Sequence, residues 1–205
     1  MAKPILLLGA TDELELLARK TNFEVVKIVE VDPSKKSNIA PVIMETPTVL
    51  RQETIKHLLM GFDSPERKEK LYKFYRFLGF EFVSAIIGTS DSDLENSEGL
   101  IMQHSAFVST NCKLGRCIKL NVGCTIMHDA SIGDFCTIAP RATLLGRVTL
   151  ENNVFVGANS TILPDIKVGN NSIVGAGAVV TKNVPANMIA RGVPARFYIN
   201  KPQKK

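Results

Sequence analysis

The chain has 205 residues, of which 45% are hydrophobic and 22% are charged, an ordinary composition for a soluble globular protein. No apolar run is long enough to span a membrane, and the N-terminus MAKPILLLGA lacks the pattern of a signal peptide, so we expect a cytoplasmic protein. The net charge of +5 lies partly in the C-terminal lysines, which we interpret as solvated ends, and we expect neither nucleic-acid binding nor membrane insertion.

The first 87 residues alternate predicted strands and helices. The connections between them are short, which is typical of a small parallel sheet of Rossmann-like type. Apolar and β-branched runs predict the strands, and Ser64 before Pro65 predicts a helix start. The predicted elements in order are strand 4–8, a helix to about residue 20, strand 24–31, loop 34–41, strand 55–60, helix 64–78 and strand 80–87.

The turn after the first predicted strand reads GATDEL, from Gly9 to Leu14. In sheets of this type, that turn is where a nucleotide phosphate binds. Only the first glycine of a phosphate-binding turn is present, and Asp12 and Glu13 place negative charge where an anion would lie. The residues themselves therefore leave two alternatives open, a structural sheet and a nucleotide-binding one.

A strict six-residue period dominates the second half of the chain. From Val108 to Val180 every sixth residue is aliphatic, and a second, mostly small column follows four positions after each. Neither a helix nor a simple strand has this period, whereas a hexapeptide-repeat β-helix does, with three hexads closing one coil. We predict a β-helix over 101–196 with both columns pointing inward, preceded by a polar linker at 88–100 and followed by a basic tail at 197–205.

His128 and Asp129 lie in a predicted turn of this repeat. Residues 18 apart share a column, so Gly146 is the neighbour of His128 in the next coil, and Lys182 lies further along. Histidine acts as a base near neutral pH, and an adjacent carboxylate orients its ring. Glycine leaves space beside the imidazole and an accessible N–H. The competing interpretation of His128 is a plain surface histidine. The basic residues near the C-terminus also have two interpretations, contact with phosphates or a solvated cap on the last coil.

The cysteines predict no metal or disulfide site. Cys112, Cys124 and Cys136 all fall on the small inward column, where core filling explains them, and Cys117 is expected to be a reduced thiol. A zinc site of three histidines would need His57, which belongs to the other domain.

Four motifs of the second half resemble the hexapeptide acyltransferases: HDASIGDF, LGRVTLENNVFVGANSTILPDIKVG, NNSIVGAGAVVTKNVP and RGVPAR. With the N-terminal sheet and the run MGFDSPERKEKLYKFYRFLGFEFV, the whole chain is similar to bacterial sugar acetyltransferases, which include sialic-acid O-acetyltransferase and the nucleotide-linked 4-amino-sugar N-acetyltransferases. The resemblance implies a left-handed β-helix, a homotrimer with active sites between subunits, and acetyl-CoA lying along the helix.

The resemblance also implies roles for individual residues. His128 matches the general base, Asp129 the acidic residue that supports it, and Gly146 the glycine whose amide faces the thioester oxygen. Thr137 replaces a second histidine common in the family. The positions expected to contact the coenzyme are Thr137, Ala158, Gly175, Ala176 and Lys182. Those expected to contact the acceptor are Gly9, Thr11, Asp12, Glu13, Asp32 and Gly61.

The expected function is acetyl transfer from acetyl-CoA to an amine or hydroxyl of a sugar, with residues 1–87 as the acceptor domain. A nucleotide-linked amino-deoxy sugar used for surface glycans is the expected acceptor, with no metal required. Two alternatives remain, O-acetylation of a free or activated sialic-acid-like sugar and a non-catalytic trimeric scaffold.

Overall fold

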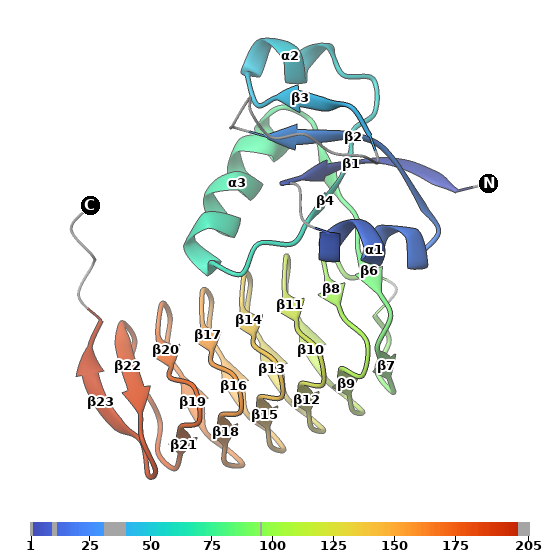
Figure 1. Cartoon of the computed structure of the whole chain (residues 1–205). Helices are drawn as coiled ribbons and strands as arrows, with labels where there is room; N and C mark the ends of the chain where they lie inside the picture. Colours follow the sequence, from blue (N-terminus) through green and yellow to red (C-terminus); the bar gives the residue numbers. More distant parts are fainter. Residues whose placement is uncertain (1, 10–11, 31–39, 95, 201–205) are drawn as a thin grey trace.

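The structure is a computed structural model that describes residues 2–9, 12–30, 40–94 and 96–200. A small α/β domain sits on one face of a long β-helix, close to the N-terminal end of that helix (Figure 1). The predicted fold class is therefore confirmed in both of its parts, a parallel sheet domain followed by a left-handed β-helix.

The sheet domain has five parallel strands in the order β3-β2-β1-β4-β5. β1 is central because its run of apolar side chains is buried on both faces of the sheet, as parallel strands require. α3 begins at Pro65 with Ser64 as its N-cap, as predicted. The elements are β1 Lys3–Leu8, α1 Asp12–Lys20, β2 Phe23–Glu30, β3 Val42–Met44, α2 Pro47–Gln52, β4 His57–Met60, α3 Pro65–Phe77 and β5 Glu81–Phe82.

Two features of this domain differ from the sequence prediction. β3 and α2 were not predicted, since a three-residue strand and a six-residue helix are too short to show a period. The predicted strand 80–87 is two strands: β5 completes the parallel sheet, while β6 (Ala85–Ile86) belongs to the β-helix. Most of the predicted loop 34–41 lies outside the described residues.

The β-helix consists of two-residue strands that pair in parallel with the strand 18 residues away, as Lys113 does with Ser131. They form three sheets, and the chain closes with an antiparallel hairpin. The strands are β7 Thr89–Ser90, β8 Ile101–Met102, β9 Phe107–Val108, β10 Lys113–Leu114, β11 Lys119–Leu120, β12 Thr125–Ile126, β13 Ser131–Ile132, β14 Thr137–Ile138, β15 Thr143–Leu144, β16 Thr149–Leu150, β17 Phe155–Val156, β18 Thr161–Ile162, β19 Lys167–Val168, β20 Ile173–Val174, β21 Val179–Val180, β22 Met188–Arg191 and β23 Arg196–Ile199.

The two inward columns form the core of the β-helix, as the period predicts. Both are buried along the helix, and their apolar members belong to one hydrophobic cluster. Leu114 and Cys112 are the exceptions, because they are only partly buried. The reason is their position: among the described residues β10 is the edge strand of its sheet, so it has a paired strand on one side only.

Every coil turns at residues in the left-handed backbone region. A positive φ recurs at six-residue intervals from Gly99 to Gly177, with values between 51° and 67°. Asparagine, aspartate and glycine tolerate this conformation best, and they supply many of the corners. Cys117 and Phe135 are unusual there, and both belong to the hydrophobic cluster that contains Tyr72 and Phe82 of the sheet domain, with the Phe135 ring against that of Tyr72.

The β-helix extends beyond its predicted limits at both ends. β6 pairs with β8, and β7, within the predicted linker 88–100, pairs with β9, so coil pairing starts before residue 101. At the other end, residues 197–199 of the predicted tail belong to β23, which pairs with β22. None of the helices in the described part of the chain has the length and apolar character needed to cross a membrane.

Candidate active site

His128 and Asp129 lie on the corner between β12 and β13. The backbone of Asp129 is left-handed, with φ of 60°, and this turns its carboxylate back onto the ring of His128. His128 Nδ1 lies 2.7 Å from Asp129 Oδ2. The pKa of the Asp129 carboxyl is below its usual range, chiefly because of this hydrogen bond, so it is a carboxylate that only accepts. Nδ1 therefore carries the proton and donates the hydrogen bond to Asp129, which leaves Nε2 as the basic nitrogen.

Gly146 lies against this nitrogen, as the 18-residue column predicts. A Cβ added at Gly146 would be 2.6 Å from His128 Cε1 and 2.7 Å from Nε2, so only glycine leaves the ring in place. Gly146 is buried, and its N–H has no acceptor among the described residues. Because buried backbone N–H groups are rarely unpaired, this donor is available to a ligand beside His128.

The nearest basic side chain does not compete with His128 for the Asp129 carboxylate. Arg147, one coil on from Asp129, makes a two-pronged ion pair with Asp165, with distances of 2.6 and 2.8 Å. The other contact of the Asp129 carboxylate in the described structure is a long one, 3.4 Å from Asn111 Nδ2. The side chains of His128 and Asp129 remain 42% and 46% exposed, so a substrate can reach them.

The expected coenzyme contacts fall on two different corners of the β-helix. Lys182 shares the corner column of His128 and is exposed. Ala158, Gly175 and Ala176 lie instead on the corner between the strands paired with β8 and those paired with β9, and Ala158 accepts a backbone hydrogen bond from the next coil there. One face of the triangular coil separates the two groups within a single chain.

Thr137 does not have the role expected for it. Its side chain has no exposed surface, and its hydroxyl lies 2.8 Å from both Lys68 Nζ and the carbonyl oxygen of Asp63. It is therefore sealed between the β-helix and the sheet domain, where a coenzyme cannot touch it. The six-residue period places Thr137 on an outward face but does not reveal that another domain covers that face.

The two glycines expected to contact the acceptor lie at the carboxyl ends of β1 and β4. Gly9 has φ of 87°, and a Cβ there would be 3.0 Å from the Phe62 ring. A Cβ at Gly61 would be 2.8 Å from Leu14 Cδ1. Both glycines are thus needed for close side-chain packing at this edge. Thr11 and Asp32 lie outside the described residues, and Asp12 begins α1.

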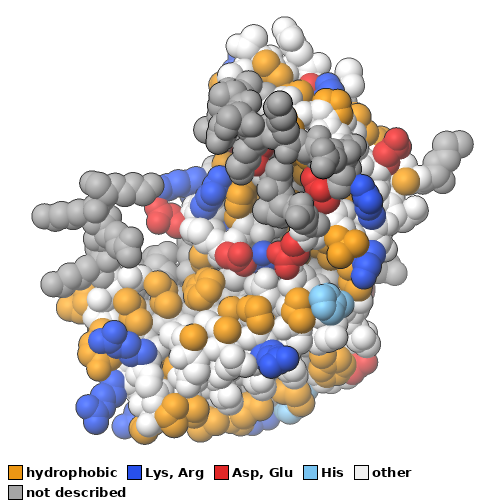
Figure 2. Space-filling model, viewed as in Figure 1, with side chains coloured by type: hydrophobic (Ala, Val, Ile, Leu, Met, Phe, Trp, Pro, Cys, Tyr) orange, Lys and Arg blue, Asp and Glu red, His pale blue; other side chains and the backbone are white. Residues whose placement is uncertain are grey.

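Glu13 turns toward the β-helix. Its carboxylate accepts a hydrogen bond from Gln103 Nε2 and lies 3.8 Å from Lys119 Nζ, which is also 3.0 Å from Asp63 Oδ1. Lys119 is only 5% exposed, although it ties two acidic side chains to β11. Figure 2 shows acidic and basic side chains side by side along the seam between the two parts. The negative charge expected at the nucleotide turn is therefore partly neutralised from the β-helix.

Arg67 is a candidate residue that the sequence interpretation missed. Its guanidinium stacks on the Phe62 ring, 3.9 Å from the ring centroid, and that ring packs on Gly9. Arg67 is exposed on the first turn of α3. Arg67 and Lys119 thus carry positive charge near the carboxyl edge of the sheet, where Glu13 and Asp63 pair with Lys119. The signal available in the sequence was its place just after β4, where ligands of such sheets bind.

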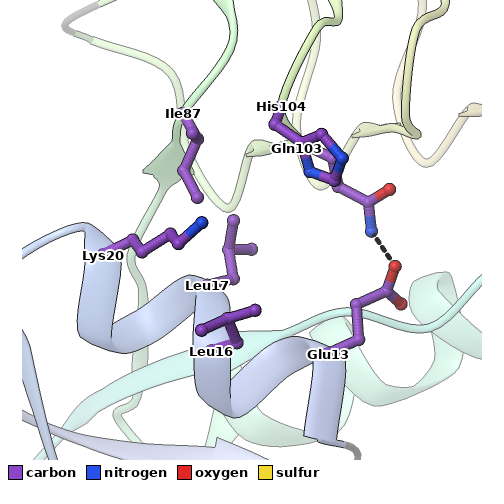
Figure 3. Close-up of a pocket in the computed structure, with 7 residues that line it drawn as sticks. All are labelled: Glu13, Leu16, Leu17, Lys20, Ile87, Gln103 and His104. Atoms are coloured by element: carbon purple, nitrogen blue, oxygen red, sulfur yellow. Dashed lines mark hydrogen bonds between the residues drawn. The ribbon is translucent and has the colours of Figure 1, made fainter.

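A small cavity of about 60 Å³ lies between α1 and the first complete coil. It is lined by Leu16, Leu17 and Ile87, with Lys20 and His104 at its rim and the Glu13–Gln103 contact at one end (Figure 3). Its apolar lining continues the seam between the domains. No group of three or more potential metal-ligating side chains occurs among the residues that the structure describes.

Comparisons of sequence connect the chain to known transferases. Residues 147–182 match the family model described as bacterial transferase hexapeptide (six repeats). Over 62 residues the chain is 38% identical to GDP-perosamine N-acetyltransferase of Escherichia coli O157:H7, and this matched segment is 30% of this chain and 28% of that protein. Over 139 residues it is 33% identical to galactoside O-acetyltransferase of Escherichia coli strain K12, covering 51% of this chain and 68% of that protein.

Comparisons of structure cover both domains. A perosamine N-acetyltransferase from Caulobacter crescentus, solved with CoA and GDP-perosamine, has a TM-score of 0.88 at 24% identity over 97% of this chain and 98% of that one. The acetyltransferase domain of PglB from Neisseria gonorrhoeae, solved with acetyl coenzyme A, has a TM-score of 0.84 at 22% identity over 97% and 100%. With its hexapeptide coils and its relationship to galactoside O-acetyltransferase, the chain belongs to the hexapeptide-repeat transferase family.

Proposed function

We propose that the protein transfers an acetyl group from acetyl-CoA to the amine of a nucleotide-linked amino-deoxy sugar in the cytoplasm. The observation that carries the proposal is the geometry at one corner of the β-helix. Asp129 holds Nδ1 of His128, so Nε2 is left as the basic nitrogen beside the N–H of Gly146, which has no acceptor in the described part of the chain. A base and an oxyanion donor side by side are the two groups that direct acyl transfer needs.

His128 removes a proton from the acceptor nitrogen as that nitrogen attacks the thioester carbonyl carbon. Gly146 donates its N–H to the carbonyl oxygen while negative charge develops there. The C–S bond then breaks, and the proton on His128 passes to the departing sulfur, which leaves as the free thiol of CoA. Cys136 takes no part as a nucleophile, because it is buried in the core and burial raises its pKa to about 12.

The acceptor is placed by this proposal at the carboxyl edge of the parallel sheet. Ligands of open α/β sheets bind at that edge, and here it is bounded by Gly9, Gly61 and Arg67. The fold match with a perosamine N-acetyltransferase that binds GDP-perosamine supports a nucleotide-linked sugar. The guanidinium of Arg67 is suited to a diphosphate.

We propose a homotrimer because the site residues fall on two corners. Lys182 and Gly146 share the corner of His128, whereas Ala158 and Ala176 are on another. A second copy of the chain brings one kind of corner against the other without any coil being rebuilt, and closed rotational symmetry repeats that contact. Light scattering is expected to give three times the mass of one chain, and a fully active monomer would refute the assembly.

The test of function is thiol release from acetyl-CoA with a panel of GDP-, UDP-, CDP- and dTDP-linked 4-amino sugars, free amino sugars and galactosides. Turnover with a nucleotide-linked amine and none with the matching free sugar is the expected result. Turnover with hydroxyl acceptors alone would instead favour O-acetylation, which the galactoside O-acetyltransferase relative makes the second candidate. Absence of transfer to every acceptor would favour a scaffold.

A nucleotide titration tests the acceptor edge separately. Binding of UDP, GDP, CDP and dTDP is measured by calorimetry for the parent protein, for Arg67→Ala and for Lys70→Ala. Lys70 is the matched control, an exposed cation on the same helix that pairs with Glu66. We expect Arg67→Ala to weaken binding of the preferred nucleotide by about 10-fold to 100-fold, the usual value of a charge-assisted hydrogen bond. Equal affinities of all three proteins would remove Arg67 from the site.

A further inference from the structure

The seam between the two domains contains a set of polar contacts centred on Asp63, whose side chain is itself exposed whereas its partners Lys119 and Thr137 are buried. This residue follows β4 and Gly61, and it joins the acceptor edge of the sheet to two neighbouring coils. Its carboxylate pairs with Lys119 on β11 at 3.0 Å, and its carbonyl oxygen accepts the Thr137 hydroxyl on β14 at 2.8 Å. Lys119 and Thr137 are direct partners in the β11–β14 ladder. Asp63 is therefore held at two adjacent points on a rigid sheet.

Lys68 completes this set from the first turns of α3. Its Nζ donates to the Thr137 hydroxyl and to the carbonyl oxygen of Cys136, both at 2.8 Å, and the residue is 1% exposed. The Thr137 hydroxyl thus accepts from Lys68 and donates to Asp63, so both its roles are used. Burying a lysine between two domains carries a desolvation cost, and the two hydrogen bonds of Lys68 offset part of it.

We propose that Lys68 and Thr137 are positioning residues that hold the acceptor edge of the sheet domain, through Asp63, in register with the β-helix. The inference rests on the proposed function, because it assumes that the acceptor binds at this edge and the acetyl donor along the β-helix. Fixing two substrates relative to each other is a large part of catalysis in a two-substrate reaction. The contacts among Lys68, Thr137 and Asp63 would hold the two binding sites in place without touching either substrate.

The protonation of Lys68 gives this contact a pH dependence. The described hydrogen bonds of Nζ go to two acceptors, which match the two N–H groups of a neutral amine and leave the third proton of an ammonium ion without one. The groups facing it are the Cys136 and Cys117 thiols, the Asp63 carboxylate and the Lys119 ammonium. Asp63 is paired with Lys119, and burial lowers the pKa of Lys68 to about 7.

Kinetics of Thr137→Val and Thr137→Ser test the proposal. Valine keeps the shape but loses both hydrogen bonds, while serine retains the hydroxyl. We expect Thr137→Val to raise KM for the acceptor by about 10-fold to 100-fold, the usual effect of two lost hydrogen bonds, with KM for acetyl-CoA unchanged. Thr137→Ser should restore the acceptor KM. An unchanged acceptor KM in Thr137→Val, or an equal rise in both KM values, overturns the proposal.

The pH profile tests the part of Lys68. The acceptor KM of the parent protein should rise as pH falls below about 7, and Lys68→Met should lose that dependence. Lys70→Met, on the exposed face of the same helix, should keep it. A profile that is the same in parent and Lys68→Met would show that Lys68 does not position the edge.

Hydrogen exchange separates this inference from the proposed function. If the parent protein acetylates no nucleotide-linked sugar, the proposed function fails, but the contacts are still tested. Backbone amides from 61 to 64 should then exchange faster in Thr137→Val than in the parent, with amides of the coils beyond β17 unchanged. Unaltered protection at 61–64 rejects the positioning role, and it does so even if Lys68→Met or Thr137→Val is less stable overall.

Discussion

Glycines at the two ends of the proposed reaction do opposite things. Gly146, on the β-helix, leaves room for the ring of His128, a polar group that faces solvent. Gly9 and Gly61, on the sheet, leave room for Phe62 and Leu14, which are apolar and fill the space themselves. The absence of a side chain therefore leaves a polar ring accessible in the β-helix, whereas in the sheet domain it allows close apolar packing.

The geometry of the two sites is maintained in two different ways. The His128 corner is fixed by the ladder, because residues in successive coils stack in the register of paired strands. The edge of the sheet is fixed by side chains, including polar ones that reach across to the β-helix. Substitutions at the corner should thus change chemistry with little effect on stability, and substitutions at the seam should change both.

Removing the base should have the largest effect. His128→Ala is expected to lower kcat by about 10²-fold to 10⁴-fold, the usual share of a positioned general base, with little change in KM for acetyl-CoA. Steady-state kinetics measure it, and His57→Gln is the control, since His57 lies in the sheet domain near Glu81. Near-parental turnover in His128→Ala would remove this residue from the mechanism.

Gly146→Ala should come next. The added methyl would lie 2.6 Å from His128 Cε1, so the ring must rotate away from the oxyanion donor. Loss of one such alignment typically costs about 10²-fold to 10³-fold in kcat. The thermal midpoint should change little, because the contact is with the end of a side chain that can move into solvent. A large loss of stability at parental kcat would show that Gly146 serves packing rather than the reaction.

Asp129→Asn should have a smaller effect on rate. The pKa of Asp129 is lowered chiefly by the bond to His128, and the carboxylate in turn stabilises the charged imidazole during proton transfer. Replacing it with a neutral amide should lower kcat by about 10-fold to 100-fold, the value of a charge-assisted hydrogen bond. Steady-state kinetics with acetyl-CoA and the preferred acceptor measure it. Parental kcat in Asp129→Asn would indicate that Asp129 does not orient the ring.

At the seam, the expected effect is on stability. The folded chain loses the Lys68 proton near pH 7, whereas the unfolded chain keeps it to about pH 10. The unfolded state binds more protons between these values, so the free energy of unfolding rises with pH there, by up to about 1.4 kcal/mol per pH unit. Chemical denaturation of the parent and of Lys68→Met at about pH 7, 8 and 9 measures the difference. Equal slopes would show that Lys68 stays charged.

The β-helix could be predicted almost entirely from sequence, since its inward columns repeat every six residues and one period fixes the depth of every side chain. The pairing of His128 with Gly146 followed from the same arithmetic. The seam could not, because the period does not say which outward face another domain covers. Thr137 looked like an open position for that reason. Lys68 was hidden among the charges of PERKEKLYK, although its spacing to Tyr72 and Tyr75 marks it as part of the buried helix face.

The sheet domain was predictable in outline only. Alternating strands and helices gave the parallel arrangement, but β3 and α2 are too short to show periodicity. The run FEFVSAII was predicted as one strand because nothing in its composition shows the bend between Phe82 and Ala85. That bend is where the chain leaves one architecture for the other, and pairing partners distant in sequence decide it.

The left-handed corners that recur every six residues also limit how such a molecule can change in evolution. A gain or loss of a few residues within a strand would put the following side chains out of phase with the inward columns unless the extra residues loop out at a corner, so the stack itself changes length in steps of one whole coil. A coil inserted between His128 and Gly146 would have to bring its own glycine to the corner, whereas one inserted beyond Gly146 would lengthen the molecule and leave the reaction centre intact. The proposed active site therefore depends on two neighbouring coils, and the number of remaining coils sets the length of surface along which the proposed donor would lie.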